Sequence, residues 1–353
     1  MLIFEQMERR NHEQVVFCNE ESSGLRAIIA IHDTTLGPAL GGVRMYPYAS
    51  EEDALIDVLR LSKGMTYKAS VAGLNLGGGK AVIIGDPKKD KSEALMRAFG
   101  RFVETLGGRY ITAEDVGTDV RDMEYVLAET RHVVGVSVAH GGSGDPSPVT
   151  AYGVWRGIQA CVAAALERTS LEGLHVAVQG LGKVGYWLAK HLVDNGARVT
   201  GCDLDQERAA QVQSELGIEL VPPESIFDVP CDVFSPCAMG GVINDDSLER
   251  LQCKIIAGAA NNQIAEERHG RALEERGILY APDFVINAGG LINVYCEIDG
   301  YDRERALRMC DAIYDKLLEI FRIARSDPAI TTHDAAQVLA RRRIESVRRL
   351  RRL

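Results

Sequence analysis

Hydrophobic and polar positions in the first third of the chain alternate between two periods, one typical of strands and one typical of helices. Apolar, β-rich runs at 14–18, 25–31 and 81–84 predict strands. Apolar residues recur every three or four positions within 51–62, and a second such stretch spans 92–106. Both stretches predict helices packed on the strands, so this part of the chain is expected to be an α/β domain.

The second half repeats the same alternation more regularly. A helix is predicted at 149–166, a short apolar strand at 175–179, a helix to about 195 and another strand at 198–202. Further strands are predicted at 231–235, 254–258 and 278–280, with helices near 245–251 and 265–276. Strands that alternate with helices in this way predict a doubly wound parallel sheet.

A glycine motif connects the first two of these strands to a chemical function. Residues 180–185 (GLGKVG) follow a strand and open a helix, and Asp203 ends the next strand 23 positions after Gly180. This context makes Gly-x-Gly-x-x-Gly a strong indication of dinucleotide binding, with the pyrophosphate at the helix N-terminus. A carboxylate at Asp203 favours NAD over NADP, although Arg208 could soften that preference.

Asparagines follow two later elements of the same half. Asn261 and Asn262 come after the run 257–260, and Asn287 lies in 285–290. Their amides could hold a carboxamide or a ribose of the cofactor. Asparagine is also common in turns, which is the alternative interpretation.

Two lysines in the first half stand on either side of three glycines: Lys68, then Gly77, Gly78 and Gly79, then Lys80. Glycines permit a close backbone approach and positive φ, so the segment is interpreted as a turn that admits a ligand. An amine that is partly desolvated beside a second cation has a lowered pKa and can act as a base. A tight turn with a solvated lysine is the alternative.

An acidic residue follows the short strand predicted at 109–112. Asp115 lies just beyond the strand's carboxyl end, where α/β proteins place functional groups. The alternative is a helix cap, a role that Thr118 or Asp119 would fill better.

Composition narrows the class of protein. The 353 residues are 46% hydrophobic and 25% charged, with a formal net charge of −10. These values favour a two-domain globular protein and argue against nucleic acid as a partner. The chain has no long apolar run and no signal-peptide profile at its start, so no membrane contact and a cytoplasmic location are expected. Eight scattered cysteines without a Cys-x-x-Cys pair, and histidines without a zinc pattern, predict no metal.

The segment 138–148 is rich in Gly, Ser, Asp and Pro and predicts a hinge or a loop lining a cleft. The expected organisation is therefore a first domain at 1–136 for substrate binding and oligomerisation, and a dinucleotide-binding domain at 145–330. A basic helix at 331–353 is expected to fold back onto the first domain. Its solvated cationic face is preferred over docking to nucleic acid or a membrane.

Long motifs make the chain recognisable. They are 31–42 (IHDTTLGPALGG), 64–68 (GMTYK), 74–80 (LNLGGGK), 112–117 (TAEDVG), 146–153 (PSPVTAYG) and 257–263 (AGAANNQ). Over nearly its whole length the chain resembles the amino-acid dehydrogenases that act on glutamate, leucine, phenylalanine and valine, with the leucine-acting members most similar.

The resemblance implies a fold of two domains separated by a cleft, and a homo-oligomer, with an octamer expected. It also implies reversible oxidative deamination of an L-amino acid with NAD. By match, Lys68 pairs with the substrate carboxylate, Lys80 activates water, and Asp115 moves protons to and from the amine. The expected cofactor-binding residues are Gly180, Leu181, Gly182, Lys183, Val184, Gly185, Asp203, Thr150, Asn262 and Asn287, of which Lys183 and Gly185 depart from the family pattern.

The substrate pocket implied by the resemblance comprises Lys68, Leu40, Gly41, Met65, Ala113, Leu291 and Val294. Ala113 resembles the leucine-acting enzymes, whereas Leu291 resembles the aromatic-acting ones. The four positions that would line the substrate side chain, Leu40, Ala113, Leu291 and Val294, carry no charge, which argues against glutamate. A branched-chain substrate is the first expectation, an aromatic one is the alternative, and a non-catalytic NAD-binding regulator is a third possibility that the two lysines and Asp115 disfavour.

Overall fold

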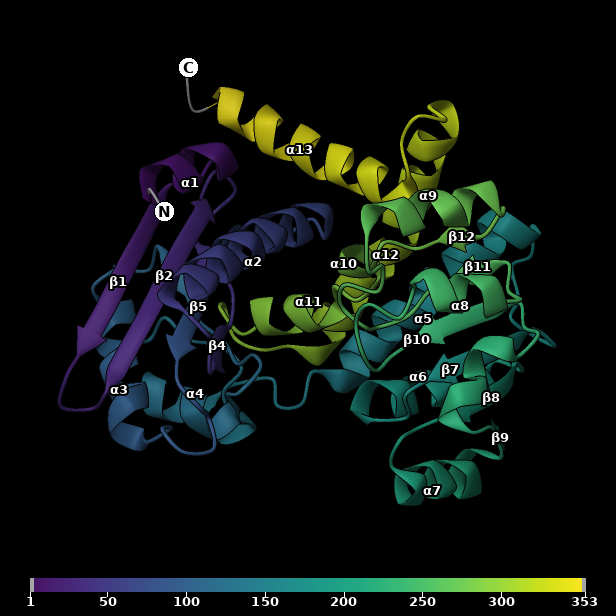
Figure 1. Cartoon of the computed structure of the whole chain (residues 1–353), viewed down its shortest axis with the longest axis horizontal. Coiled ribbons are helices and arrows are strands. Elements are labelled where there is room, and N and C mark those ends of the chain that lie inside the picture. The colour runs from purple at the N-terminus through teal and green to yellow at the C-terminus, as the bar shows by residue number, and fades with distance from the viewer. Residues whose placement is uncertain (1–2, 351–353) are drawn as a thin grey trace. The chain divides into compact units, whose positions relative to one another are not determined.

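The chain divides after Gly144 in the computed structural model, which describes residues 3–350 (Figure 1). The first unit holds the described residues up to Gly144, the segment Val294–Asp302 and the chain from Ala340 onward. The second unit holds Asp145–Asn293 and Arg303–Leu339. The basic helix expected to return to the first domain is thus shared, because its residues before Ala340 belong to the second unit. Residues 351–353 of that expected segment lie outside the described residues.

A mixed sheet of six strands organises the first unit. Its order is β1-β2-β5-β3-β6, and β4 also pairs with β5. Strand β2 runs antiparallel to β1 and β5, whereas β3 and β4 run parallel to β5. The elements are α1 (Ile3–Arg10), β1 (Gln14–Glu20), β2 (Leu25–Asp33), β3 (Ala39–Leu40), β4 (Val43–Tyr46), α2 (Glu51–Val71), β5 (Gly77–Ile84), α3 (Glu93–Glu104), β6 (Tyr110–Ile111), α4 (Val120–Leu127) and the 3₁₀ turn η1 (Val138–His140).

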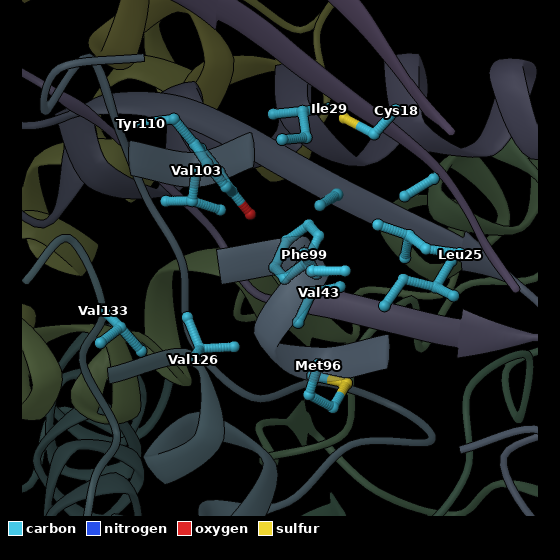
Figure 2. Packing of buried hydrophobic residues seen from close by; sticks show 14 of the residues in the cluster. Cys18, Leu25, Ile29, Val43, Met96, Phe99, Val103, Tyr110, Val126 and Val133 are labelled. Carbon is cyan, nitrogen blue, oxygen red and sulfur yellow. The ribbon is translucent and has the colours of Figure 1, made fainter. Parts of the chain in front are cut away.

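Alternation along the strands gives this sheet two buried faces. On one face, Ile28 and Val82 pack against Val58 and other apolar residues of α2. On the opposite face, Ile29 packs in a larger cluster with residues of α3 and α4 (Figure 2). Burial on both faces explains why the sequence shows continuous apolar runs here instead of strict alternation.

The second unit contains a parallel sheet in the order β12-β11-β10-β7-β8-β9. This order is that of dinucleotide-binding sheets, with the reversal between β7 and β10. The elements after Gly144 are α5 (Ser147–Leu166), β7 (His175–Gln179), α6 (Lys183–Asp194), β8 (Arg198–Cys202), α7 (Gln206–Leu216), β9 (Glu219–Leu220), η2 (Pro223–Asp228), β10 (Val233–Pro236), α8 (Asp245–Arg250), β11 (Ile255–Ile256), α9 (Glu267–Glu275), β12 (Leu279–Tyr280), α10 (Asp283–Ile286), α11 (Gly289–Tyr295), α12 (Arg303–Ser326) and α13 (Thr332–Leu350). The C-terminal ends of α11 and α13 belong to the first unit. The predicted α/β class and the doubly wound sheet are confirmed.

Two predicted boundaries in the first unit are wrong. Helix α2 continues to Val71 instead of ending near position 62, so Lys68 lies in its last turn. Strand β5 begins at Gly77 instead of position 81. The three glycines are therefore part of a buried strand and not a turn. Within residues 3–350, no helix combines the length and apolar character needed to span a membrane.

Candidate active site

The glycines before Lys80 bring protein elements together. A Cβ at Gly78 would lie 2.1 Å from the Thr66 backbone nitrogen of α2, and one at Gly79 would lie 2.6 Å from the Tyr110 ring. Neither glycine has a positive φ. The expected turn that admits a ligand is therefore wrong. These glycines let α2 and Tyr110 pack directly against β5, which fixes the strand that carries Lys80.

A second glycine pair places Asp115. A Cβ at Gly41 would lie 1.8 Å from the Gly79 carbonyl oxygen, and one at Gly42 would lie 2.4 Å from the Glu114 carbonyl oxygen. The segment after β6 consequently runs close beside β4, with a bridge between Val43 and Glu114. This close approach places Asp115 beside β4, the strand that pairs with the Lys80 strand β5.

Lys80 and Asp115 form an ion pair in the first unit. The Lys80 Nζ lies 3.0 Å from Asp115 Oδ2, and Lys80 is only 5% exposed. Arg44 of β4 donates from Nε to the same Oδ2 at 2.9 Å. The Asp115 carboxylate is therefore held by two cations. The cap of α4 is Asp119, so Asp115 has no capping role.

The surroundings shift the pKa values of both partners. Burial lowers the pKa of Lys80 below the ordinary lysine value, although the charge of Asp115 opposes this change. Burial also pushes the pKa of Asp115 upward, but the charges of Lys80 and Arg44 outweigh it and hold that pKa below its ordinary value. Asp115 is thus a carboxylate at neutral pH, and Lys80 releases its proton more readily than a solvated lysine does.

The other predicted residues of the first unit lie on the elements around this pair. Lys68 and Met65 are half-buried in the second half of α2. Leu40 is buried on β3, and Ala113 is buried between β6 and Asp115. The Met65 side chain would meet a Cβ at Gly41 at 3.4 Å, so Met65 and Gly41 are neighbours. Val294 is half-buried and belongs to the same unit.

In the second unit, the glycine loop has the shape that a dinucleotide requires. A Cβ at Gly182 would meet no atom within 4 Å, so open space lies in front of the loop. Gly182 also precedes α6 without a side-chain cap. By contrast, a Cβ at Gly185 would lie 1.9 Å from the Gly180 carbonyl oxygen, which requires glycine where helix and strand pack closely. The exposed Lys183 begins α6.

Asp203 lies at the end of β8 beside this loop. Its Oδ2 accepts a hydrogen bond of 2.7 Å from the Leu181 backbone N–H. Arg208 donates to the Leu181 carbonyl at 3.1 Å and lies over the Tyr186 ring. The residues of the loop therefore fit a dinucleotide, with an acceptor group at the position of the ribose.

The predicted asparagines come together in the same unit. Asn287 donates from Nδ2 to Asn261 Oδ1 at 2.7 Å and to the Ala259 carbonyl at 3.0 Å. Asn262 adopts φ 51°, and its backbone N–H donates to Asp283. These bonds hold the loop after β11, so turn chemistry contributes to the choice of asparagine here.

Thr150 and Leu291 also belong to the second unit. The Thr150 hydroxyl bonds to the Pro146 carbonyl at 2.9 Å, and it would lie 3.0 Å from a Cβ at Gly290. Leu291 follows directly in α11 and is 6% exposed.

Sequence patterns do not reveal a network of side chains beside this ion pair. Arg44, Asp57 and Tyr48 form a network behind Asp115, in which Asp57 Oδ2 accepts from Arg44 Nη1 at 3.0 Å and from the Tyr48 hydroxyl at 2.7 Å. The adjacent Gly41-Gly42 pair was an available sign of close packing, but the partners are too far apart in sequence for a local pattern to connect them.

Comparisons with known proteins assign most of the chain to one family. Residues 12–132 match the model of the Glu/Leu/Phe/Val dehydrogenase dimerisation domain, and residues 141–207 and 203–347 match that of glutamate/leucine/phenylalanine/valine dehydrogenase. The chain belongs to the Glu/Leu/Phe/Val dehydrogenase family. It is thus an oxidoreductase, and the predicted resemblance is confirmed.

Individual members of this family are similar along nearly their full length. Leucine dehydrogenase of Thermoactinomyces intermedius is 58% identical over 351 residues, covering 99% of this chain and 96% of that protein. Leucine dehydrogenase of Geobacillus stearothermophilus is 56% identical, with coverage of 99% and 95%. The crystal structure of L-tryptophan dehydrogenase from Nostoc punctiforme has a TM-score of 0.88 and 47% identity, covering 98% of this chain and 100% of that one.

Proposed function

We propose that this protein catalyses the reversible, NAD-dependent oxidative deamination of a branched-chain aliphatic L-amino acid, with L-leucine as the expected substrate. The products are the 2-oxo acid, ammonium, NADH and a proton. The observation that carries the proposal is the buried Lys80–Asp115 pair, which joins a lysine of lowered pKa to a carboxylate that stays ionised. The 58% identity to a leucine dehydrogenase supports the same reaction.

Lys68 binds the substrate in this proposal. Its ammonium group pairs with the α-carboxylate and so orients the α-carbon. Its place in the last turn of α2, which Gly78 allows to pack closely on β5, supports a fixed position near Lys80.

Lys80 and Asp115 carry the proton transfers. Asp115 accepts a proton from the substrate ammonium, which frees the amine lone pair. When bound in the second unit, NAD would supply the acceptor for the α-hydrogen and its electron pair. Neutral Lys80 then takes a proton from water as the water oxygen bonds to the α-carbon. The C–N bond breaks as Asp115 returns its proton to the leaving nitrogen, and the hydroxyl proton passes to the released ammonia, which leaves as ammonium. Lys80 finally releases its proton to solvent. Water is consumed, and its oxygen becomes the keto oxygen of the 2-oxo acid.

Residues of the second unit would hold NAD. Gly180–Gly185 and the uncapped start of α6 suit the pyrophosphate, and Asp203 suits the ribose hydroxyls. Thr150, Asn262 and Asn287 are proposed to complete the cofactor site. A carboxylate at Asp203 disfavours a 2′-phosphate, which supports NAD over NADP.

Substrate choice rests on the apolar residues Leu40, Met65, Ala113, Leu291 and Val294. The identity to leucine dehydrogenases favours an aliphatic side chain. Leu291 and the 47% identity to an L-tryptophan dehydrogenase favour an aromatic substrate as the second candidate. One methylene in such a pocket changes selectivity by about 1–3 kcal/mol, so a few side chains decide between them.

A panel of L-amino acids tests the proposal. Purified protein, NAD and each amino acid are mixed, and NADH absorbance gives kcat/KM. The highest value is expected for L-leucine, followed by other branched-chain substrates, and values at least about 10-fold lower are expected for L-phenylalanine and L-tryptophan. A preference for an aromatic substrate would replace the aliphatic assignment. Absence of turnover with every amino acid would overturn the proposed function.

Assembly and location are further parts of the proposal. We propose a homo-oligomer, with an octamer expected, because the first unit matches a dimerisation domain. Analytical ultracentrifugation would measure its mass. A cytoplasmic location is also proposed, and cell fractionation would test it.

A further inference from the structure

Arg44 lies on the strand next to Lys80 and points to the same side of the sheet. Strands β4 and β5 pair in parallel, with Arg44 opposite Val82 and Val43 opposite Ala81. Lys80 and Val82 are two positions apart, so both face the side on which Arg44 lies. The same face packs against α2, which carries Asp57.

The Arg44 guanidinium joins two carboxylates. Nε donates to Asp115 Oδ2 at 2.9 Å, and Nη1 donates to Asp57 Oδ2 at 3.0 Å. Asp57 is itself held by the Tyr48 hydroxyl at 2.7 Å and, on its other oxygen, by Arg60 at 2.9 Å. Because the guanidinium is planar and its donors are fixed relative to one another, an anchored Asp57 fixes the direction in which Nε points.

Both cations at Asp115 contact the same oxygen. Lys80 Nζ and Arg44 Nε both lie on Oδ2. Among residues 3–350, no side chain or backbone group donates a hydrogen bond to Oδ1. The side chain of Asp115 is 23% exposed, so its carboxylate retains access to a small molecule.

We propose that Arg44 is a positioning residue of the amino-acid dehydrogenase reaction: held by Asp57, it fixes Asp115 through Oδ2 and so presents Oδ1 to the substrate amine. This inference rests on the proposed function. It assigns to Arg44 no contact with the substrate. Its effect is exerted through the orientation of Asp115 and through its charge beside Lys80.

The charges around Lys80 give the proposal a pH signature. The groups concerned are Arg44 from β4, Tyr48 just after it, Asp57 and Arg60 from α2, Tyr110 from β6, and Asp115. The positive charge of Arg44 lowers the pKa of Lys80, whereas the negative charge of Asp57 raises it. If neutral Lys80 is the base, kcat rises with pH through the pKa of Lys80, which gives the pH profile a rising limb. Removal of the Arg44 charge therefore moves this limb to higher pH, and removal of the Asp57 charge moves it to lower pH.

The experiment compares kcat, KM and their pH profiles for wild type, Arg44→Gln, Arg44→Lys and Asp57→Asn. Arg44→Gln is expected to lower kcat about 100-fold with little change in KM, and to move the rising limb to higher pH. Arg44→Lys keeps the charge but cannot bridge both carboxylates, so kcat falls while the limb stays in place. Asp57→Asn is expected to move the limb to lower pH.

Arg97→Gln is the matched control, because Arg97 also joins two carboxylates, Glu93 and Glu129, away from Lys80. Its kinetics are expected to match wild type. If Arg44→Gln does not fold, as judged by thermal unfolding and NADH binding, Arg44→Lys and Asp57→Asn decide the question. A raised KM with unchanged kcat would make Arg44 a substrate-binding residue and overturn the proposal.

The outcomes separate this inference from the proposed function. An active wild type whose pH profile is unchanged in Arg44→Gln and Asp57→Asn would overturn only the role of Arg44. A wild type without turnover on any amino acid would overturn the proposed function and this inference together.

Discussion

At the scale of single residues, burial and pairing distinguish lysines that look alike in the sequence. Lys80 is 5% exposed and paired with Asp115, whereas the Lys89 side chain is 78% exposed and pairs with Asp86 on the surface. Burial of an amine favours its neutral form, and the pKa of Lys80 is lowered by its burial. The chemistry proposed for Lys80 is therefore a property of its place on β5.

Replacement of Lys80 tests this difference. Lys80→Ala is expected to lower kcat by about 10²–10⁴-fold, because the base is lost, while NADH binding is retained. Steady-state kinetics and fluorescence titration with NADH measure the two quantities. Lys89→Ala serves as the control and should keep wild-type rates. Wild-type turnover in Lys80→Ala would remove Lys80 from the mechanism.

At the scale of elements, the close packing of α2 on β5 explains why the sequence does not predict the second half of α2 or the start of β5. The buried residues in the second half of α2 are Ser62, Thr66, Ala69, Ser70 and, at its end, Val71. Ser62 and Thr66 are small, and at these two positions the helix lies directly against Gly78. Small polar residues do not produce an apolar period, so the sequence predicts a helix that ends near position 62 and a turn at the glycines.

The second unit was predicted more closely because its elements carry local patterns. Strands β7 and β8 have the predicted bounds, and α6 ends within one residue of its prediction. Apolar β-branched runs, a glycine turn and a terminal aspartate all lie within about 30 residues, the length of one βαβ unit. The Arg44–Asp57 contact has no such local pattern, and only the folded chain reveals it.

Substitution of two glycines in the turn between β7 and α6 is expected to have opposite effects, one on cofactor binding and the other on stability. Gly182→Ala places a methyl group in open space at φ −63°, so stability should be unchanged. NADH binding should weaken, because the methyl group occupies space proposed for the pyrophosphate. Gly185→Ala places it 1.9 Å from the Gly180 carbonyl oxygen and should destabilise the fold by about 1–3 kcal/mol.

Urea unfolding and NADH titration of both variants check these expectations. The wild-type protein and the two variants form a set in which stability and cofactor binding change separately. Unchanged NADH affinity in a stable Gly182→Ala variant would contradict the placement of the cofactor at this loop.

At the scale of the whole molecule, the end of the chain completes a unit that the beginning of the chain forms. The described part of the chain from Ala340 onward belongs to the first unit. Ser70 of α2 donates from its hydroxyl to the Ala340 carbonyl at 2.8 Å, and Arg348 pairs with Asp33. Part of the basic tail therefore serves internal contacts, in addition to the solvated face predicted from sequence.

Arg343 donates hydrogen bonds to three acceptors in and after α2. It donates to the carbonyls of Ser70 and Leu74 and to the Asn75 side chain, at 3.3, 2.6 and 2.9 Å. These acceptors lie at the end of α2 and in the turn after it, where helix carbonyls lack partners within the helix. A cation at this end also interacts favourably with the helix dipole. Arg343 thus holds the turn of α2 that contains Lys68.

Arg343→Ala is therefore expected to cost about 1–3 kcal/mol of unfolding free energy, because buried carbonyls lose a charged donor. It should also raise KM for the amino acid more than KM for NAD, since Lys68 is proposed to bind the carboxylate and the cofactor is proposed to bind the other unit. Urea unfolding and steady-state kinetics measure both effects. Arg342→Ala removes an exposed arginine one position away and should change neither quantity. Equal effects of the two substitutions would mean that the tail acts through its overall charge and not through the Arg343 contacts.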